Sequence, residues 1–185
     1  MPEVLKINRG QETGIISIMH AVQRDNSKTH AGMLTVQLNE LVKEAIAFTE
    51  DYAKASQDER GARVRFKTEL ADNLLTVRAD KGELRNIFIN LLRNAIDSIA
   101  GEARITVRTW AEDAQAVAEV RYTDERMSDE VQGELFRTPF VKGGEREANQ
   151  RIATCYRIVR LHGGDIEIKS ALNEGTTFTV KLPGA

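Results

Sequence analysis

The chain has 185 residues, of which 41% are hydrophobic and 29% are charged, and its net charge is −2. This length and composition favour one globular domain with a helical appendage and exclude a wholly disordered chain. The charge gives no concentrated basic surface for nucleic acid or for an anionic membrane. No stretch approaches the roughly 20 apolar residues that cross a bilayer, and a signal-peptide pattern is lacking, so we expect a cytoplasmic protein.

The first part of the chain is predicted to contain two helices. Apolar residues at helical spacing predict a helix over residues 15–22, and a polar connector follows over 25–32. A second amphipathic helix is predicted from about 38 to 56, ending near Gly61. The first of these helices is short, and its apolar face is a plausible partner surface.

Two short strands and a long helix are predicted next. Segments 63–70 and 74–78 alternate in polarity, and the turn residues Asp72 and Asn73 between them predict a hairpin. A wide apolar stripe predicts a helix over 81–100, which Gly101 could end with a left-handed cap. The stripe consists of Leu84, Ile87, Phe88, Leu91, Leu92, Ala95, Ile96 and Ile99.

The last part of the chain mixes strands and helices. Strands are predicted over about 104–110 and 116–123, a short helix over 128–137, and an irregular segment to about Ala148. A helix over about 149–161 follows. The chain then ends with a hairpin whose turn lies at 173–175. Its first strand carries Ile166 and Ile168, which oppose Phe178, Val180 and Leu182 on the second strand. This order predicts an α+β fold, a two-layer sandwich with helices on one face of a largely antiparallel sheet.

Four blocks carry a resemblance to a known family. Segment 90–97, Asn-Leu-Leu-Arg-Asn-Ala-Ile-Asp, resembles the N-box of the ATPases that unite histidine kinases, gyrases and Hsp90-type chaperones. Segments 156–164 and 175–183 resemble the closing helix and last hairpin of sensor-kinase catalytic domains, and 38–42 resembles their opening helix. The blocks occur in the family's order, and the resemblance covers about residues 36–183.

The resemblance implies a division of the chain into two parts. Residues 33–185 would form the ATPase-type domain, and residues 1–32 a helix and connector that remain from a dimerisation hairpin. Residues 14–28 are similar to the second helix of that hairpin, while the first helix, which bears the phosphoacceptor histidine in such kinases, is absent. The N-terminal helix is thus a candidate surface for a homodimer.

The N-box residues suggest a site for magnesium and phosphate. Asn90 and Asn94 lie one helical turn apart, so their amide oxygens can project from the same face of the helix. Asp97 follows on the same helix. In the kinases that the chain resembles, the asparagine at the position of Asn94 ligates magnesium. Weakly bound ATP with magnesium, or no cofactor at all, is what we expect here, because other motifs have changed.

The adenine-binding motif is altered. Family members have an aspartate that accepts a hydrogen bond from the adenine amino group, and Tyr122 stands at that position here. Asp124 could take the role if the loop were two residues shorter. Tyr122 shares a strand face with Ala118 and Val120, so its ring is predicted to point inward and to fill the space of the adenine.

The phosphate-binding glycine motif is altered too. Family members have glycines at the positions of 147–152, where backbone N–H groups cradle phosphate, and this chain has none of them. Glu145 and Glu147 add negative charge there. The two altered motifs together would weaken nucleotide binding by a factor of about a hundred or more. An alternative hypothesis is that Lys142 and Arg151 contact phosphate directly and recover part of the lost affinity.

The histidines and the cysteine suggest no catalytic group. His20 lies beside an apolar helix face, His30 lies in the connector, and His162 comes before Gly-Gly, at a helix end where the dipole favours a histidine. Cys155 has apolar neighbours at helical spacing and is predicted to be buried. No set of His, Cys and carboxylates has metal-site spacing.

We therefore predict a degenerate histidine-kinase-like module of two-component signalling. Such a module does not turn over ATP efficiently and acts through protein partners, either a kinase or a response regulator. One alternative is the ATP-binding domain of an active sensor histidine kinase. A further alternative is a kinase-like histidine phosphotransfer protein, which would need an acceptor histidine.

Overall fold

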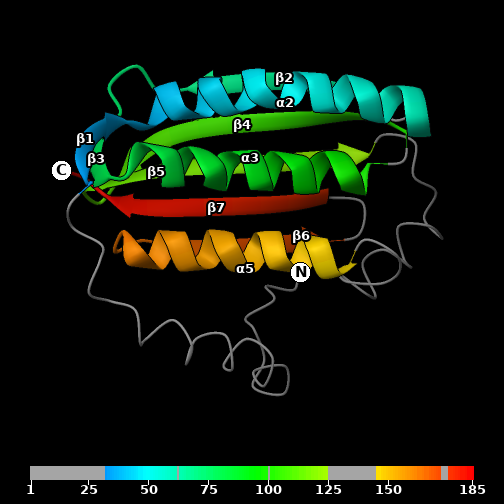
Figure 1. Ribbon diagram of the computed structural model, residues 1–185. Coiled ribbons are helices and arrows are strands. Elements are labelled where there is room, and N and C mark those ends of the chain that lie inside the picture. The colour runs from blue at the N-terminus through cyan, green and yellow to red at the C-terminus, as the bar shows by residue number, and fades with distance from the viewer. Residues whose placement is uncertain (1–31, 62, 100, 125–144, 172–174) are drawn as a thin grey trace.

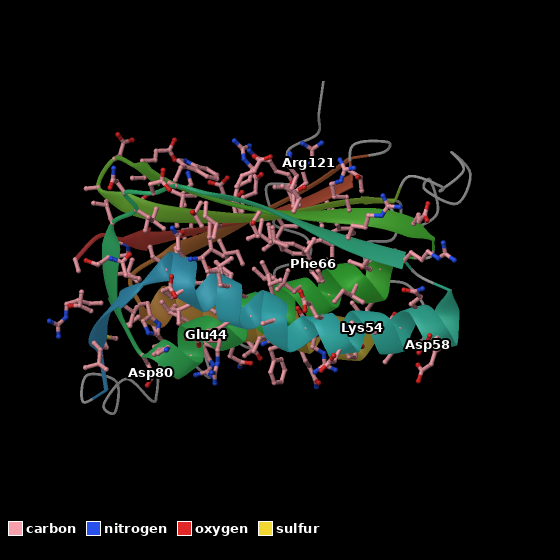
Figure 2. The ribbon with its side chains drawn as sticks, turned by 90° about the horizontal axis from the view of Figure 1, so that it is seen from above. Glu44, Lys54, Asp58, Phe66, Asp80 and Arg121 are labelled. Atoms are coloured by element: carbon pink, nitrogen blue, oxygen red, sulfur yellow. The ribbon has the colours of Figure 1, made fainter. Side chains whose placement is uncertain are left out.

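The computed structural model of the protein describes residues 32–61, 63–99, 101–124, 145–171 and 175–185 and shows two layers (Figures 1 and 2). Helices cover one face of a five-stranded sheet. The helices are α2 (Leu38–Arg60), α3 (Lys81–Ser98) and α5 (Glu145–Leu161). The sheet strands are β2 (Arg63–Leu70), β4 (Glu102–Glu112), β5 (Gln115–Asp124), β6 (Asp165–Ala171) and β7 (Gly175–Pro183). The predicted α+β sandwich is confirmed, whereas the helices predicted over 15–22 and 128–137 lie outside the described residues.

The five strands have the order β2-β4-β5-β7-β6. The pairs β4–β5, β5–β7 and β6–β7 are antiparallel, and β2 pairs with β4 in parallel. In the last hairpin Ile166 lies opposite Val180 and Ile168 opposite Phe178, which confirms the predicted pairing. The sheet is therefore largely antiparallel, with one parallel strand at its edge.

The hairpin predicted from 63–70 and 74–78 is wrong. Thr76–Ala79 forms strand β3, which pairs with a strand that was not predicted, β1 (Leu34–Gln37), in a separate two-stranded sheet. Instead of turning back onto β2, the chain is held at Ala71 by contacts with β4 and α2. The N–H group of Ala71 donates to Thr109 on β4, and its carbonyl oxygen accepts from the Asn39 side chain on α2.

The core lies between the helices and the sheet, as Figure 2 shows for Phe66 on the inner face and Arg121 on the outer face. Every residue of the predicted α3 stripe is buried. Gly61 ends α2 in a left-handed conformation, close to the predicted end. The predicted left-handed cap at Gly101 is wrong, because α3 ends at Ser98 and Ile99 continues in an extended conformation.

Candidate functional site

Asp80, at the start of α3, is held by hydrogen bonds of both its main chain and its side chain. Asp80 caps the helix, since its side chain accepts a hydrogen bond of 2.9 Å from the N–H group of Glu83. The N–H group of Asp80 in turn donates to Nε2 of His162 at 3.1 Å, and Nδ1 of His162 lies 2.8 Å from the carbonyl oxygen of Ile158. These contacts require a neutral imidazole with its proton on Nδ1. His162 therefore bonds a carbonyl in the last turn of α5, and it also links this helix end to the start of α3.

The two asparagines of α3 lie on one face of the helix, toward α5. Asn94 is buried, with 7% of its surface exposed, and Asn90 is half-buried. Asn90 hydrogen-bonds the Cys155 side chain on α5, whose sulfur also lies 3.6 Å from the carbonyl oxygen of Ile87. Cys155 is buried as predicted. Among the described residues no group of His, Cys, Asp and Glu could hold a metal ion.

Burial raises the pKa of the Cys155 thiol from 9.0 to about 12. Because the folded pKa lies above the unfolded one, the thiol stabilises the fold below pH 9, and this stabilisation is lost as the pH rises toward 12. We expect the native thiol to react with a labelling reagent only when the protein opens. Labelling measured over a urea series at pH 8 should follow unfolding, and labelling as fast as a free cysteine peptide in the native state would contradict this.

A polar network joins α2, α3 and α5 around Asp97. Arg151 Nη2 on α5 lies 2.6 Å from one carboxylate oxygen of Asp97, and the Tyr52 hydroxyl on α2 donates to the other at 2.6 Å. The guanidinium of Arg93 lies 4.4 Å from the centre of the Tyr52 ring. Tyr52 and Arg93 were not singled out from the sequence, because Tyr52 is 45 residues from Asp97 and no local pattern signals such a contact.

Tyr122 lies where the strand alternation predicts. It stands opposite Ile105 on β4 and Thr176 on β7, is half-buried, and packs against the core. A Cβ atom added at Gly175, which has a φ of 82°, would collide with the carbonyl oxygen of Tyr122. Asp124 is the last residue of β5, and its side chain lies outside what the structure describes. The sequence prediction that Tyr122 points inward is confirmed.

The start of α5 differs from the prediction. The helix begins at Glu145 rather than near Asn149, so 147–152 is helical and is no turn before a helix. The side chains of Glu145 and Glu147 lie outside the described residues, as does Lys142. Arg151 is in this helix, and its contact with Asp97 brings together two of the predicted site residues.

The sequence model of the histidine kinase-, DNA gyrase B- and HSP90-like ATPases matches residues 79–185. The chain belongs to this ATPase family. The match includes α3 with its asparagines, β5 with Tyr122, α5 and the last hairpin. This is the family that the motifs suggested, and three of the four sequence blocks, 90–97, 156–164 and 175–183, lie within the matched residues.

Relatives of the chain within this ATPase family are bacterial sensor kinases. The chain is 30% identical over 114 residues to sporulation kinase D of Bacillus subtilis, covering 62% of the chain and 22% of that protein. It is 29% identical over 155 residues to the signal transduction histidine-protein kinase AtoS of Escherichia coli, covering 83% of the chain and 24% of AtoS. The chain is a histidine-kinase-type ATPase domain, and its matched segment spans about a quarter of the length of these relatives.

Solved structures of the ATPase family share the fold. The nucleotide-free catalytic domain of histidine kinase ThkA superposes with a TM-score of 0.62 at 22% identity, covering 82% of this chain and 95% of that one. ThkA solved in complex with the response regulator protein TrrA gives a TM-score of 0.58 at 21% identity, over 100% of this chain and 53% of that one. No helix among the described residues has the length and apolar character to cross a membrane.

Proposed function

We propose that this domain keeps the histidine-kinase ATPase fold but binds ATP and magnesium weakly or not at all. It acts in two-component signalling through contacts with other proteins. The ion pair between Arg151 and Asp97 carries the proposal, because it joins α5 to the N-box helix where the resembling kinases hold nucleotide phosphates.

The main chain at the start of α5 supports the proposal. A phosphate cradle needs free N–H groups, which a helix offers only in its first turn. Because α5 begins at Glu145, the N–H groups of 149–152 lie beyond the first turn and bond to carbonyl groups within the helix. For these backbone N–H groups to bind phosphate, as those of a glycine-rich turn do, the helix would have to unwind.

The side chains at this place also oppose an anionic ligand. The side chains of Arg151 and Asp97 are only 15% and 25% exposed, and Asp97 bonds Tyr52 as well. A phosphate that bound Arg151 would have to separate the ion pair. The partly buried carboxylate of Asp97 would then lie without its cation and next to the negative phosphate. Magnesium would have to offset that charge for binding to occur. The alternative in which Arg151 contacts phosphate directly is therefore weakened.

Tyr122 adds a second obstacle, at the adenine end. Its ring packs against the core from the inner face of β5, between Ile105 and Thr176. A phenol at this position cannot supply the carboxylate that accepts the adenine amino hydrogen bond in the resembling kinases. The proposal thus rests on independent changes at the two ends of the nucleotide site.

The partners follow from the kinase relatives. ThkA forms a complex with a response regulator, and we infer that this domain binds a response regulator or a partner kinase. A homodimer through the N-terminal helix remains part of the proposal. A histidine phosphotransfer role is disfavoured for His162, which is 7% exposed and has both ring nitrogens bonded; His20 and His30 lie outside the described residues.

One observation favours the second candidate, the ATP-binding domain of an active sensor kinase. Asn90 and Asn94 retain the one-turn spacing on α3 that presents two amides from one face. In this candidate Asn94 would ligate magnesium, and release of Asp97 from Arg151 would come before nucleotide binding.

Calorimetric titration of ATP and ADP with magnesium decides between the candidates. We expect a Kd of about 1 mM or weaker, because a lost charge-assisted hydrogen bond and a lost anion cradle together weaken binding about a hundredfold or more. A micromolar Kd for the unaltered chain would overturn the proposal and establish an active nucleotide site. Titration with purified response regulators then tests the partner.

A further inference from the structure

The outer face of the five-stranded sheet carries no helix among the described residues, and its charges are sorted by sign. Helices α2, α3 and α5 lie on the other face, as Figure 2 shows. The strand register aligns the outward side chains in rows across the strands. Two neighbouring rows, which we call the basic row and the acidic row, differ in charge. The basic row is Lys67, Thr106, Arg121, Thr177 and Lys169, and the acidic row is Glu69, Arg108, Glu119, Thr179 and Glu167.

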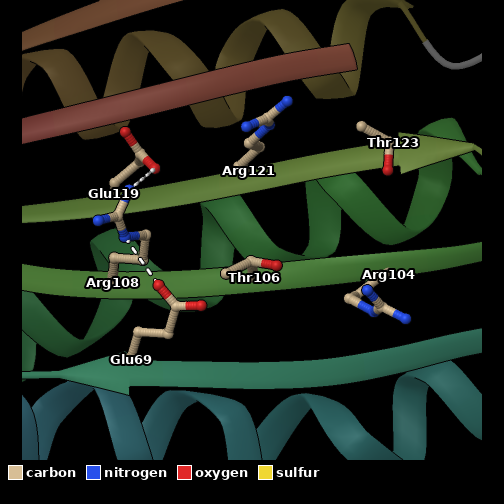
Figure 3. A pocket seen from close by; sticks show the side chains of 7 residues that line it. All are labelled: Glu69, Arg104, Thr106, Arg108, Glu119, Arg121 and Thr123. Carbon is tan, nitrogen blue, oxygen red and sulfur yellow. Dashed lines mark ion pairs between the residues drawn. The ribbon is translucent and has the colours of Figure 1, made fainter. Parts of the chain in front are cut away.

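The sorting of charge extends beyond these two rows. On the basic side, Arg65 lies opposite Arg104 in the next row. Figure 3 shows Arg104 and Arg121 toward one end of the strands and Glu69 toward the other. The hydrogen bond from Lys67 holds the pKa of Glu69 below its usual range, so this carboxylate is ionised at neutral pH. The outer face thus has a basic end and an acidic end.

Three strands carry the same arrangement of charges. On β2, Lys67 precedes Glu69 by two positions. On β6, which runs in the opposite direction, Glu167 precedes Lys169, so the basic residue again lies in the basic row. Strand β5 runs in the same direction as β6 and repeats this order. The three pairs of basic and acidic residues are Lys67 and Glu69, Arg121 and Glu119, and Lys169 and Glu167.

This arrangement makes the face complementary to itself. A two-fold axis that lies between the two rows, parallel to the sheet and across the strands, places each strand over the same strand of a second copy with its direction reversed. Lys67 then faces Glu69 of the second copy, and Lys169 faces Glu167. Sheets that pack face to face are rotated relative to each other by about 30°, and rows beside the axis are displaced least by this rotation.

We propose that this face is a contact surface between two copies of the chain. A second copy fits both ends of the face, whereas a wholly acidic or wholly basic partner would be repelled by one of them. In the next rows, Arg104 would face Trp110 of the second copy, which places a cation over an aromatic ring. Glu102 would face Glu112 only at the rim, where each carboxylate already has a cation at 3.6 Å.

The contact is expected to be weak. Strand spacing and rise give a face of roughly 20 by 25 Å, or about 500 Å² on each copy, which is less than the ~800 Å² of a stable complex. Lys67 and Glu69 already pair within one chain at 2.7 Å, so the second copy adds to an existing ion pair. Exposed ion pairs contribute little each and are screened by salt. We expect a Kd on the order of 0.1–1 mM at low ionic strength and no association through this face in about 0.5 M salt.

Sedimentation equilibrium of the full chain measures the association at low and at high ionic strength. Two charge-reversed variants test the geometry. Lys67→Glu/Lys169→Glu gives both rows acidic residues on β2 and β6, and Glu69→Lys/Glu167→Lys gives both rows basic residues there. Each variant alone should associate at least about tenfold more weakly than the unaltered chain. Mixing the two variants should restore association, because acidic positions of one variant then face basic positions of the other in both rows.

Lys43→Glu/Lys54→Glu is the matched control, because it makes the same change of charge at exposed positions of α2. It should associate like the unaltered chain, and it should not restore association when mixed with Glu69→Lys/Glu167→Lys. A homodimer through the N-terminal helix would be alike in every variant, so the differences among the variants report the sheet face.

Three outcomes would overturn the proposal. The first is that the unaltered chain shows no salt-dependent association up to about 1 mM. The second is that the charge-reversed variants associate as strongly as the unaltered chain. The third is that the control restores association in the mixture as well as Lys67→Glu/Lys169→Glu does. None of these outcomes depends on whether the domain binds ATP.

Discussion

Replacing Tyr122 with aspartate and Arg151 with glycine in one chain is expected to raise the affinity for ATP about a hundredfold. The aspartate restores an acceptor for the adenine amino group. The glycine removes the side chain that ties α5 to Asp97 and weakens the helix at that point, which frees backbone N–H groups for phosphate. Magnesium would offset the charge of the released Asp97. Calorimetry with ATP and magnesium measures the gain.

The two single variants separate the two ends of the site. The Tyr122→Asp gain should appear with ATP and adenosine but not with GTP, because it acts on the base. The Arg151→Gly gain should appear with ATP and GTP but not with adenosine, because it acts on phosphate. Arg157→Gly is the matched control on an exposed position of α5 and should leave all affinities unchanged. Equal effects of Arg151→Gly and Arg157→Gly would mean that the Asp97 contact does not oppose binding.

Asp97→Ala is expected to lower the free energy of unfolding by about 2–4 kcal/mol. The substitution leaves the Arg151 guanidinium and the Tyr52 hydroxyl without their shared acceptor, in a place where both partners of the ion pair are mostly buried. Urea unfolding monitored by circular dichroism measures the change. Asp97→Ala, Arg151→Ala and the double variant form a double-mutant cycle. The double variant should lose less free energy of unfolding than the two single variants together, because it leaves no unpaired charge.

Asp165→Ala provides the matched control. Asp165 also pairs with an arginine of α5, Arg160, but at 3.4 Å and with both side chains more than half exposed. Such surface pairs contribute little, so the loss should stay within about 0.5 kcal/mol. If Asp97→Ala costs no more than Asp165→Ala, the network around Asp97 does not stabilise the fold, and the case for a closed nucleotide site weakens with it.

Local patterns in the sequence correctly predicted the features that depend on residues close together in the chain. The α3 stripe repeats at helical spacing, so the buried residues from Leu84 to Ile99 could be identified before the structure was known. The inward direction of Tyr122 followed from the alternation of β5. The last hairpin joins neighbouring strands, and its pairing was likewise predicted correctly. The family motifs placed these elements in one known fold.

Contacts between distant segments could not be predicted in this way. The strand over 63–70 looked like half of a hairpin, but its partner β4 begins beyond α3, and the nearby Thr76–Ala79 pairs with a strand earlier in the chain. Arg151 and Asp97 are 54 residues apart, and only the packing of α5 against α3 brings them together. The asparagines of the site were found from the sequence, and the network around Asp97 was not.

The parallel strand at the edge of the sheet affects how the domain meets copies of itself. Among the strands that the structure describes, β2 pairs with β4 alone, so its other edge presents backbone groups that could pair with a second chain and start aggregation. Its exposed side chains are charged at four positions, Arg63, Arg65, Lys67 and Glu69. A second copy of β2 laid alongside would bring mostly like charges together. Self-association by continuing the sheet across two molecules is thus discouraged.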